Sequence, residues 1–247
     1  MIFLFTVLSN VQTQSSDLQV HDPVMIKQGD TYYLYCTGFG ISAFSSTDMV
    51  NWKSLPRVFQ TPPEWAMKEV PGFRGHIWAP DISFMNGKYY LYYSVSTFAS
   101  NRSCIGLAVN TTLDPGDPEY AWRDQGKVVQ SVPGRDLWNA IDPNLVVDGD
   151  GVPWLSFGSF WRGMKLFKLN DEFSAPAKPE EWHTIAARPR DYYTNEVEPG
   201  EGAIEAPFIF RKNDYYYLFV SFDFCCRGIE SNYKIMVGRS EKVAGPY

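Results

Sequence analysis

Four turns along this sequence place a carboxylate beside a proline, and each turn leads into a segment rich in aromatic residues. The acids of these turns are Asp22, Asp81, Asp142 and Glu205. Their spacing of roughly sixty residues predicts repeated sheet units that return an acid to the same structural position around one axis. Cleavage of a glycosidic bond needs one protonated and one ionised carboxyl group. The pattern therefore suits cleavage of a glycosidic bond.

Asp22, Asp142 and Glu205 lie at equivalent turns of three repeats, so we expect them to converge at the axis. Desolvation and mutual repulsion would then raise the pKa of one carboxyl group above the others. Asp81 follows its proline instead of preceding it, so we expect its side chain to point elsewhere and to make a structural hydrogen bond. The alternative for all these turns is that they only shape the start of a strand.

Each turn is followed by a hairpin, for which Asn86-Gly87 provides one of the tight turns. Third strands are predicted near 41–45 and 105–109, and outer strands near Trp52 and Trp122. Four such strands make one blade of a β-propeller. No segment has a sustained helical period of apolar residues. The chain ends while the fourth blade is reaching its outer strands, so we expect either a four-bladed propeller or a fragment of a longer one.

Composition excludes several classes of protein. Aromatic residues make up 16% of the chain and apolar residues 45%, which favours pleated strands and flat platforms for sugars. The net charge is −6, and no cluster of basic residues could hold a phosphate backbone, so nucleic acid is not an expected partner. The four cysteines, Cys36, Cys104, Cys225 and Cys226, lack zinc-site spacing. We expect free buried thiols, with a disulfide between the two neighbouring cysteines as the alternative.

The first sixteen residues have the character of an export segment. Met1 to Leu8 form an apolar run too short to span a bilayer, and a polar stretch follows. A basic beginning and a clean cleavage site are missing, so an N-terminal strand or a truncated start is the alternative. We expect residues 1–16 to direct export and residues 17–247 to form the catalytic propeller, without membrane association.

Several segments resemble glycoside hydrolase family 43, and within it the endo-1,5-α-L-arabinanases. The resemblance extends from about His21 to Tyr247, and its most specific parts are the Asn-Ala-Ile-Asp and Glu-Gly-Ala-Ile-Glu-Ala-Pro stretches. The segments that carry it are His21 to Pro23, Trp78 to Asp81, Trp138 to Pro143, Gly158 to Trp161 and Gly200 to Pro207.

The resemblance implies a five-bladed β-propeller that works with inversion, of which this chain covers about four blades, with the C-terminal blade missing. Asp22 then stands at the general base, Glu205 at the general acid, and Asp142 at the carboxylate that tunes and orients the acid. A ring lacking one blade would leave strand edges and apolar blade faces exposed.

Candidate sugar-binding residues follow from the stacking of sugars on aromatic rings and from the same resemblance. Trp78 and Phe98 could form an apolar platform beneath an arabinofuranose ring. The residues predicted to line the cleft are Asn139, Ser159 and Trp161. We expect His76, close to Trp78 in the sequence, to be a loop residue outside the site.

Arabinanases of this type commonly carry a calcium ion in the central channel, held largely through waters and one histidine of the fifth blade. The three histidines of this chain are His21, His76 and His183, and none occupies that position. We therefore assign no metal ligand, and calcium remains only an implication of the resemblance.

The sequence thus predicts a secreted or periplasmic, monomeric hydrolase that cuts α-1,5 linkages in the arabinan side chains of pectin. An α-L-arabinofuranosidase or a β-xylosidase of the same family is the nearest alternative. An inactive propeller that binds plant polysaccharide is the alternative from a different class of protein.

Overall fold

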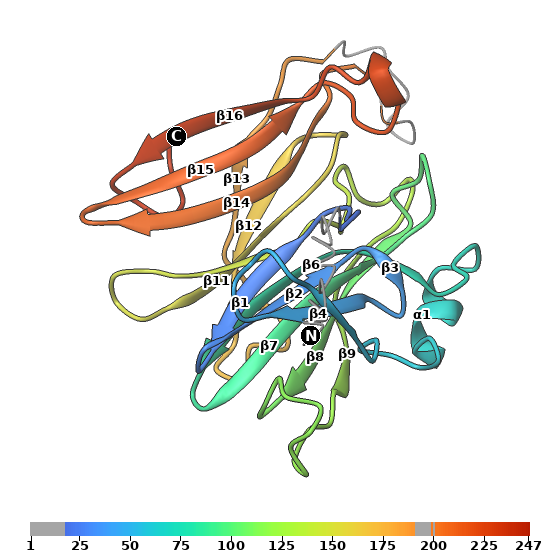
Figure 1. The fold of residues 1–247 in the computed structure, drawn as a ribbon. Helices are drawn as coiled ribbons and strands as arrows, with labels where there is room; N and C mark the ends of the chain where they lie inside the picture. Colours follow the sequence, from blue (N-terminus) through green and yellow to red (C-terminus); the bar gives the residue numbers. More distant parts are fainter. Residues whose placement is uncertain (1–17, 191–198, 200) are drawn as a thin grey trace, which may run out of the picture.

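The computed structural model describes residues 18–190, 199 and 201–247. Four antiparallel sheets follow one another along the chain as propeller blades (Figure 1). The all-β prediction of about four blades of a propeller is confirmed. The predicted export segment, residues 1–16, lies outside the described residues.

The first two blades are joined through a short strand. The first sheet has the order β1 (Val24–Gln28), β2 (Thr31–Cys36), β4 (Ser42–Ser46) and β5 (Lys53–Leu55). The second has the order β3 (Gly38–Phe39), β6 (His76–Met85), β7 (Lys88–Val95), β8 (Ser103–Asn110) and β9 (Arg123–Ser131). Strand β3 follows β2 in the chain but pairs with β6, so the second sheet has five strands instead of the expected four.

The remaining blades differ in strand number. The third sheet has the order β10 (Asn144–Val147), β11 (Pro153–Phe157), β12 (Met164–Lys168) and β13 (Trp182–Ala186). The fourth has three strands: β14 (Ile204–Lys212), β15 (Tyr215–Phe222) and β16 (Lys234–Ser240). The helical elements of the described chain are α1 (Glu64–Glu69) and the 3-10 turn η1 (Gly228–Glu230).

Hairpin turns form where the sequence predicts them. Asn86 and Gly87 have φ values of 50° and 74° and join Met85 to its partner Lys88. A left-handed backbone is what this two-residue turn requires, and Asn and Gly adopt it at low cost.

A separate hydrophobic core lies between each consecutive pair of blades. Strand β7 shows how one sheet serves two cores, because alternate side chains of a strand point to opposite faces. Tyr89, Leu91 and Tyr93 pack in the core shared with the first blade, whereas Tyr90 and Tyr92 pack in the core shared with the third. A third core joins β10–β12 to β14 and β15. Packing between blades therefore fixes the position of the turns at the axis.

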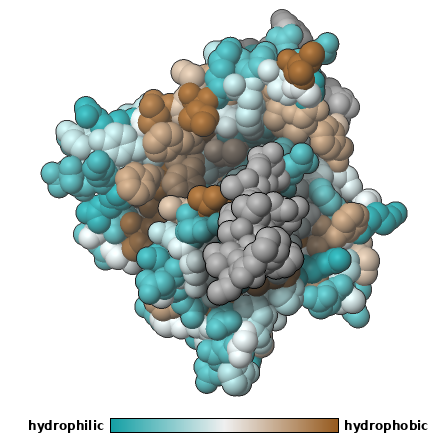
Figure 2. Space-filling model, viewed as in Figure 1, coloured by the Kyte–Doolittle hydropathy of each residue, from teal (hydrophilic) through white to brown (hydrophobic). Residues whose placement is uncertain are grey.

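The fourth sheet exposes large apolar side chains, and apolar residues gather over it in the surface view (Figure 2). Those with the most exposed surface are Phe208, Phe210, Ile235, Met236 and Val237. This agrees with the expectation of an exposed apolar blade face. No helix within the described residues is both long enough and apolar enough to cross a membrane.

Candidate active site

The four blades share one backbone feature at the start of the inner strand. The residue before proline is left-handed in each: Asp22 (φ 48°), Ala79 (φ 37°), Asp142 (φ 58°) and Ala206 (φ 54°). A positive φ is uncommon for residues other than glycine and is found at functional sites. The structural repeat is therefore this residue and its proline.

The acids occupy different places relative to that residue, which corrects the expectation of one common position. Asp22 and Asp142 are the left-handed residues themselves. Glu205 comes one residue earlier and Asp81 two residues later. Asp22, Asp142 and Glu205 nevertheless all line one cleft of about 900 Å³. The longer side chain of Glu205 therefore still reaches the axis.

Asp22 is the open acid of the cleft, with 39% of its side-chain surface exposed. The Thr37 hydroxyl donates a hydrogen bond of 2.7 Å to Asp22 Oδ2 and accepts one of 2.9 Å from the backbone N–H of Ala79. His21 Nε2 lies 3.5 Å from the same carboxylate oxygen. Thr37 thus ties the turns of the first two blades together, a role that no sequence motif indicated.

Glu205 is held through both of its oxygens. The Ser159 hydroxyl donates to Oε2 at 2.8 Å, and the Tyr233 hydroxyl donates to Oε1 at 2.5 Å. Burial, followed by the negative charge of Glu205, raises the pKa of Tyr233, so the phenol stays protonated and remains a donor. Ser159, predicted only to line the cleft, contacts the acid directly. Tyr233 was missed, because it stands outside any recognisable motif.

Asp142 is half-buried and lines the same cleft as the other two acids. Its backbone N–H donates to the Ser94 hydroxyl at 3.0 Å, and its Oδ2 accepts a hydrogen bond of 3.2 Å from the N–H of Ala206. Burial raises the pKa of Asp142 well above its usual range, and the charges of Glu205 and Asp22 raise it further. The predicted rise in pKa within the cluster is therefore found at Asp142.

Asp81 makes the structural hydrogen bonds that the sequence predicted. Its side chain is buried, and its Oδ2 accepts a hydrogen bond of 2.9 Å from the backbone N–H of Leu145 in the next blade. Asn144 Nδ2 donates to Oδ1 at 3.3 Å. Burial raises the pKa of Asp81 to about 6, although these two hydrogen bonds act in the opposite direction.

The predicted aromatic platform lies along one wall of the cleft. Trp78 is half-buried and meets Phe98 edge to face, with 6.2 Å between ring centroids. Phe98 is 82% exposed, so its ring is open to a ligand. The Trp78 indole N–H donates to His76 Nδ1 at 3.0 Å. His76 was expected in a loop outside the site, but it begins strand β6 and lines the cleft.

Asn139 and Trp161 also border the cleft but are each only 3% exposed. Asn139 Oδ1 accepts a hydrogen bond of 2.6 Å from the Ser103 hydroxyl. Their surroundings suit support of the cleft wall more than broad contact with a sugar, and their predicted role in binding remains a prediction.

Two cysteines depart from the expectation of free thiols. Cys36 and Cys104 are free and buried, as expected. Cys225 and Cys226 form a disulfide, so the alternative holds for this pair. Both line the cleft.

Within the described ranges, no group of three or more His, Cys, Asp or Glu side chains could hold a metal ion. The calcium implied by resemblance stays a prediction.

The geometry defines a β-propeller with a cluster of carboxyl groups in its axial cleft. Residues 16–247 match the model of glycosyl hydrolases family 43, and the chain belongs to this family.

Related proteins share most of the chain. An extracellular exo-α-(1→5)-L-arabinofuranosidase of Cellvibrio japonicus is 54% identical over 94% of this chain and 67% of its own length. An extracellular endo-α-(1→5)-L-arabinanase of Bacillus subtilis is 45% identical over 94% of this chain and 68% of its own. The structure of a Cellvibrio cellulosa α-L-arabinanase complexed with arabinohexaose has a TM-score of 0.90 at 55% identity, covering 92% of this chain and 72% of that one.

Proposed function

We propose that this protein hydrolyses α-1,5-L-arabinofuranosidic linkages of arabinan with inversion of configuration. The observation that carries the proposal is the convergence of Asp22, Asp142 and Glu205 in one cleft, each in a different environment. The arabinan-cleaving names of the relatives support the substrate class.

Asp22 suits the general base because it is open to the cleft and oriented by Thr37. A carboxylate in this position takes a proton from the water that attacks the anomeric carbon. In an inverting enzyme this water needs room between the two carboxyl groups, which lie roughly 6.5–9.5 Å apart. The Thr37 hydrogen bond leaves Asp22 Oδ1 for that water.

Glu205 suits the general acid because two hydroxyls fix its carboxyl group. Proton transfer to the leaving oxygen depends on such orientation. Asp142 suits a role in orienting Glu205, because it lines the same cleft and its Oδ2 accepts a hydrogen bond from the N–H of Ala206, the residue that follows Glu205.

Product analysis on linear arabinan tests the proposal. We expect release of arabino-oligosaccharides, with the first product carrying the inverted anomeric configuration by NMR. A Glu205→Gln variant is the matched control, since it keeps the side chain's size and hydrogen-bonding oxygen. It should lose far more activity on arabinan than on an aryl arabinoside with a good leaving group, because only arabinan depends on protonation. Equal losses on both substrates would contradict the role of Glu205.

The relatives divide between exo and endo action, so the same assay decides between the two. A mixture of oligosaccharides at early times indicates endo action. A single small product released from the start indicates the exo-acting alternative. We also propose export from the cytoplasm, supported by the extracellular relatives; detection of the protein in the culture medium tests this.

A further inference from the structure

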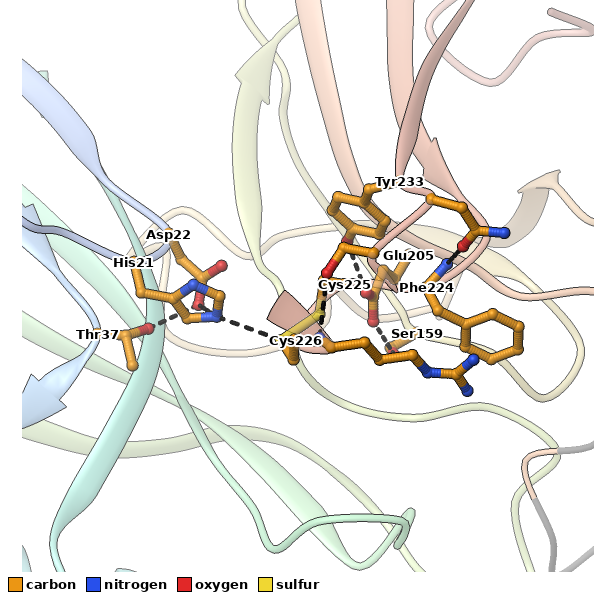
Figure 3. Close-up of a disulfide and its surroundings, with 12 residues drawn as sticks. His21, Asp22, Thr37, Ser159, Glu205, Phe224, Cys225, Cys226 and Tyr233 are labelled. Atoms are coloured by element: carbon orange, nitrogen blue, oxygen red, sulfur yellow. Dashed lines mark hydrogen bonds and ion pairs between the residues drawn. A yellow bond between two sulfur atoms is a disulfide. The ribbon is translucent and has the colours of Figure 1, made fainter. Parts of the chain in front are cut away.

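The disulfide between Cys225 and Cys226 lies in the cleft between the proposed base and the proposed acid (Figure 3). It belongs to the loop that joins β15 to β16. Cys226 Sγ is 3.9 Å from His21 Nε2, and His21 is the neighbour of Asp22. Seven residues further along the same loop, Tyr233 donates its hydrogen bond to Glu205. The loop therefore reaches both proposed catalytic groups.

Hydrogen bonds also close the loop that carries the disulfide. The N–H of Phe224 donates to Asn232 Oδ1 at 3.0 Å, and the N–H of Asn232 donates to the carbonyl of Phe224 at 3.1 Å. The N–H of Arg227 donates to the Ser231 hydroxyl at 3.0 Å, and its guanidinium lies 4.0 Å from the Phe224 ring centroid. These contacts thus hold the loop closed in addition to the disulfide.

The surface that the disulfide offers is compact and apolar. Bonding adjacent cysteines closes a small ring through the peptide bond between them, and this ring removes two S–H groups that could otherwise rotate. Divalent sulfur is polarizable and a weak hydrogen-bond acceptor, so it packs favourably against C–H groups. Cys226 is exposed and Cys225 half-exposed, which leaves the ring accessible from the cleft.

We propose that the Cys225–Cys226 disulfide is an apolar platform for the C–H face of an arabinofuranosyl ring bound between Asp22 and Glu205. This inference rests on the proposed function. Trp78 and Phe98 line the same cleft on the second blade, so the bound chain would meet apolar surface from two blades. The platform contributes to substrate binding and takes no part in proton transfer.

A double variant, Cys225→Ser with Cys226→Ser, opens the ring with little change in volume. We expect KM for linear arabino-oligosaccharides to rise roughly three- to tenfold with kcat within about twofold, because the lost contact is made equally in the ground and transition states. In a Glu205→Gln background, calorimetry should show a matching rise in Kd for the same oligosaccharides.

Reduction of the unsubstituted protein provides a second measurement that needs no substitution. Dithiothreitol converts the disulfide to two thiols and is itself oxidised to its cyclic disulfide. KM should rise on reduction and return on reoxidation. The double variant treated in the same way is the matched control and should not respond, since Cys36 and Cys104 are already thiols.

The outcomes separate this inference from the proposed function. A lower kcat at unchanged KM would mean that the disulfide positions Tyr233, and would overturn the platform. Unchanged KM and Kd after both substitution and reduction would also overturn it. Absence of activity on arabinan in the unsubstituted oxidised protein would count against the proposed function itself.

Discussion

Asp81 and Asp142 lie at corresponding turns of neighbouring blades, and burial raises the pKa of both. Their partners differ. Asp81 directs both oxygens to groups of the third blade, the N–H of Leu145 and the amide of Asn144. Asp142 faces the cleft, where its pKa is raised further by the charges of Glu205 and Asp22. One acid holds two blades together, and the other belongs to a cluster of carboxyl groups.

A shift of two residues relative to the turn produces this difference. Asn144 stands two residues after Asp142 as Asp81 stands two after Ala79. Asn144 Oδ1 accepts a hydrogen bond of 2.8 Å from the backbone N–H of Ile209 in the fourth blade, just as Asp81 accepts one from Leu145. This position therefore joins consecutive blades, whereas the left-handed residue at the turn presents its side chain to the cleft.

Substitution of the two acids should affect enzymatic activity very differently, and this is the largest difference that we expect between them. We expect Asp142→Asn to lower kcat on arabinan roughly 10²–10⁴-fold, the range of general acid–base contributions, because the cluster around Glu205 loses one of its three carboxyl groups. Asp81→Asn keeps kcat within about threefold, since both oxygens of Asp81 are engaged in hydrogen bonds to the third blade. Steady-state kinetics on folded protein checks this. An equal loss of kcat in both variants would contradict the different roles assigned to Asp81 and Asp142.

Stability should depend more on Asp81 than on Asp142. Asp81→Ala leaves the N–H of Leu145 and the amide of Asn144 buried without their acceptor, so we expect a loss of about 2–3 kcal/mol in the free energy of unfolding. Urea denaturation measures it. Asn144→Ala removes the analogous bond to Ile209 and should cost about 1–3 kcal/mol. If Asp81→Ala unfolds at the same urea concentration as the unsubstituted protein, the hydrogen bonds between blades are not what Asp81 provides.

Tyr233 tests how firmly the acid is held. Tyr233→Phe removes one hydrogen bond to Glu205 and should lower kcat about tenfold, the effect of one hydrogen bond to a charged group. The pH profile of kcat/KM should move as well, because this donor acts on the titrating cluster. Tyr215→Phe, at the start of β15 and outside the cleft lining, is the matched control. A profile unchanged in Tyr233→Phe would reduce this residue to a structural role.

The pH dependence of stability tests the raised pKa values of Asp81 and Asp142. A carboxyl group with a raised pKa binds a proton in the folded state when the unfolded chain, with a pKa of about 3.9, has lost it. Its contribution to stability therefore falls as pH rises from about 4 through the folded pKa, which is about 6 for Asp81. Asp142→Asn removes the titrating group, so the stability of this variant should fall less between acidic and neutral pH than that of the unsubstituted protein. Thermal unfolding at about pH 5 and pH 8 measures both slopes.

Some features of the site were readable from the sequence because they depend on local geometry. The proline turns and the Asn86-Gly87 hairpin follow from backbone preferences of a few adjacent residues. The position of Asp81 after its proline was enough to predict a structural hydrogen bond. His76 was misplaced, because its pairing with Phe39 across β3 and β6 joins segments distant in the chain.

By itself the sequence determined an all-β chain whose carboxylates recur at proline turns, because composition and short-range backbone preferences decide strands and turns. Only the tertiary structure decided which carboxyl group is desolvated, and which hydroxyls hold the proposed acid. Ser159 and Tyr233 stand 46 and 28 residues from Glu205, and Cys226 stands 205 residues from His21. Such contacts, and the pKa of each acid, depend on how the blades pack, since desolvation and charge separation are properties of the assembled cleft.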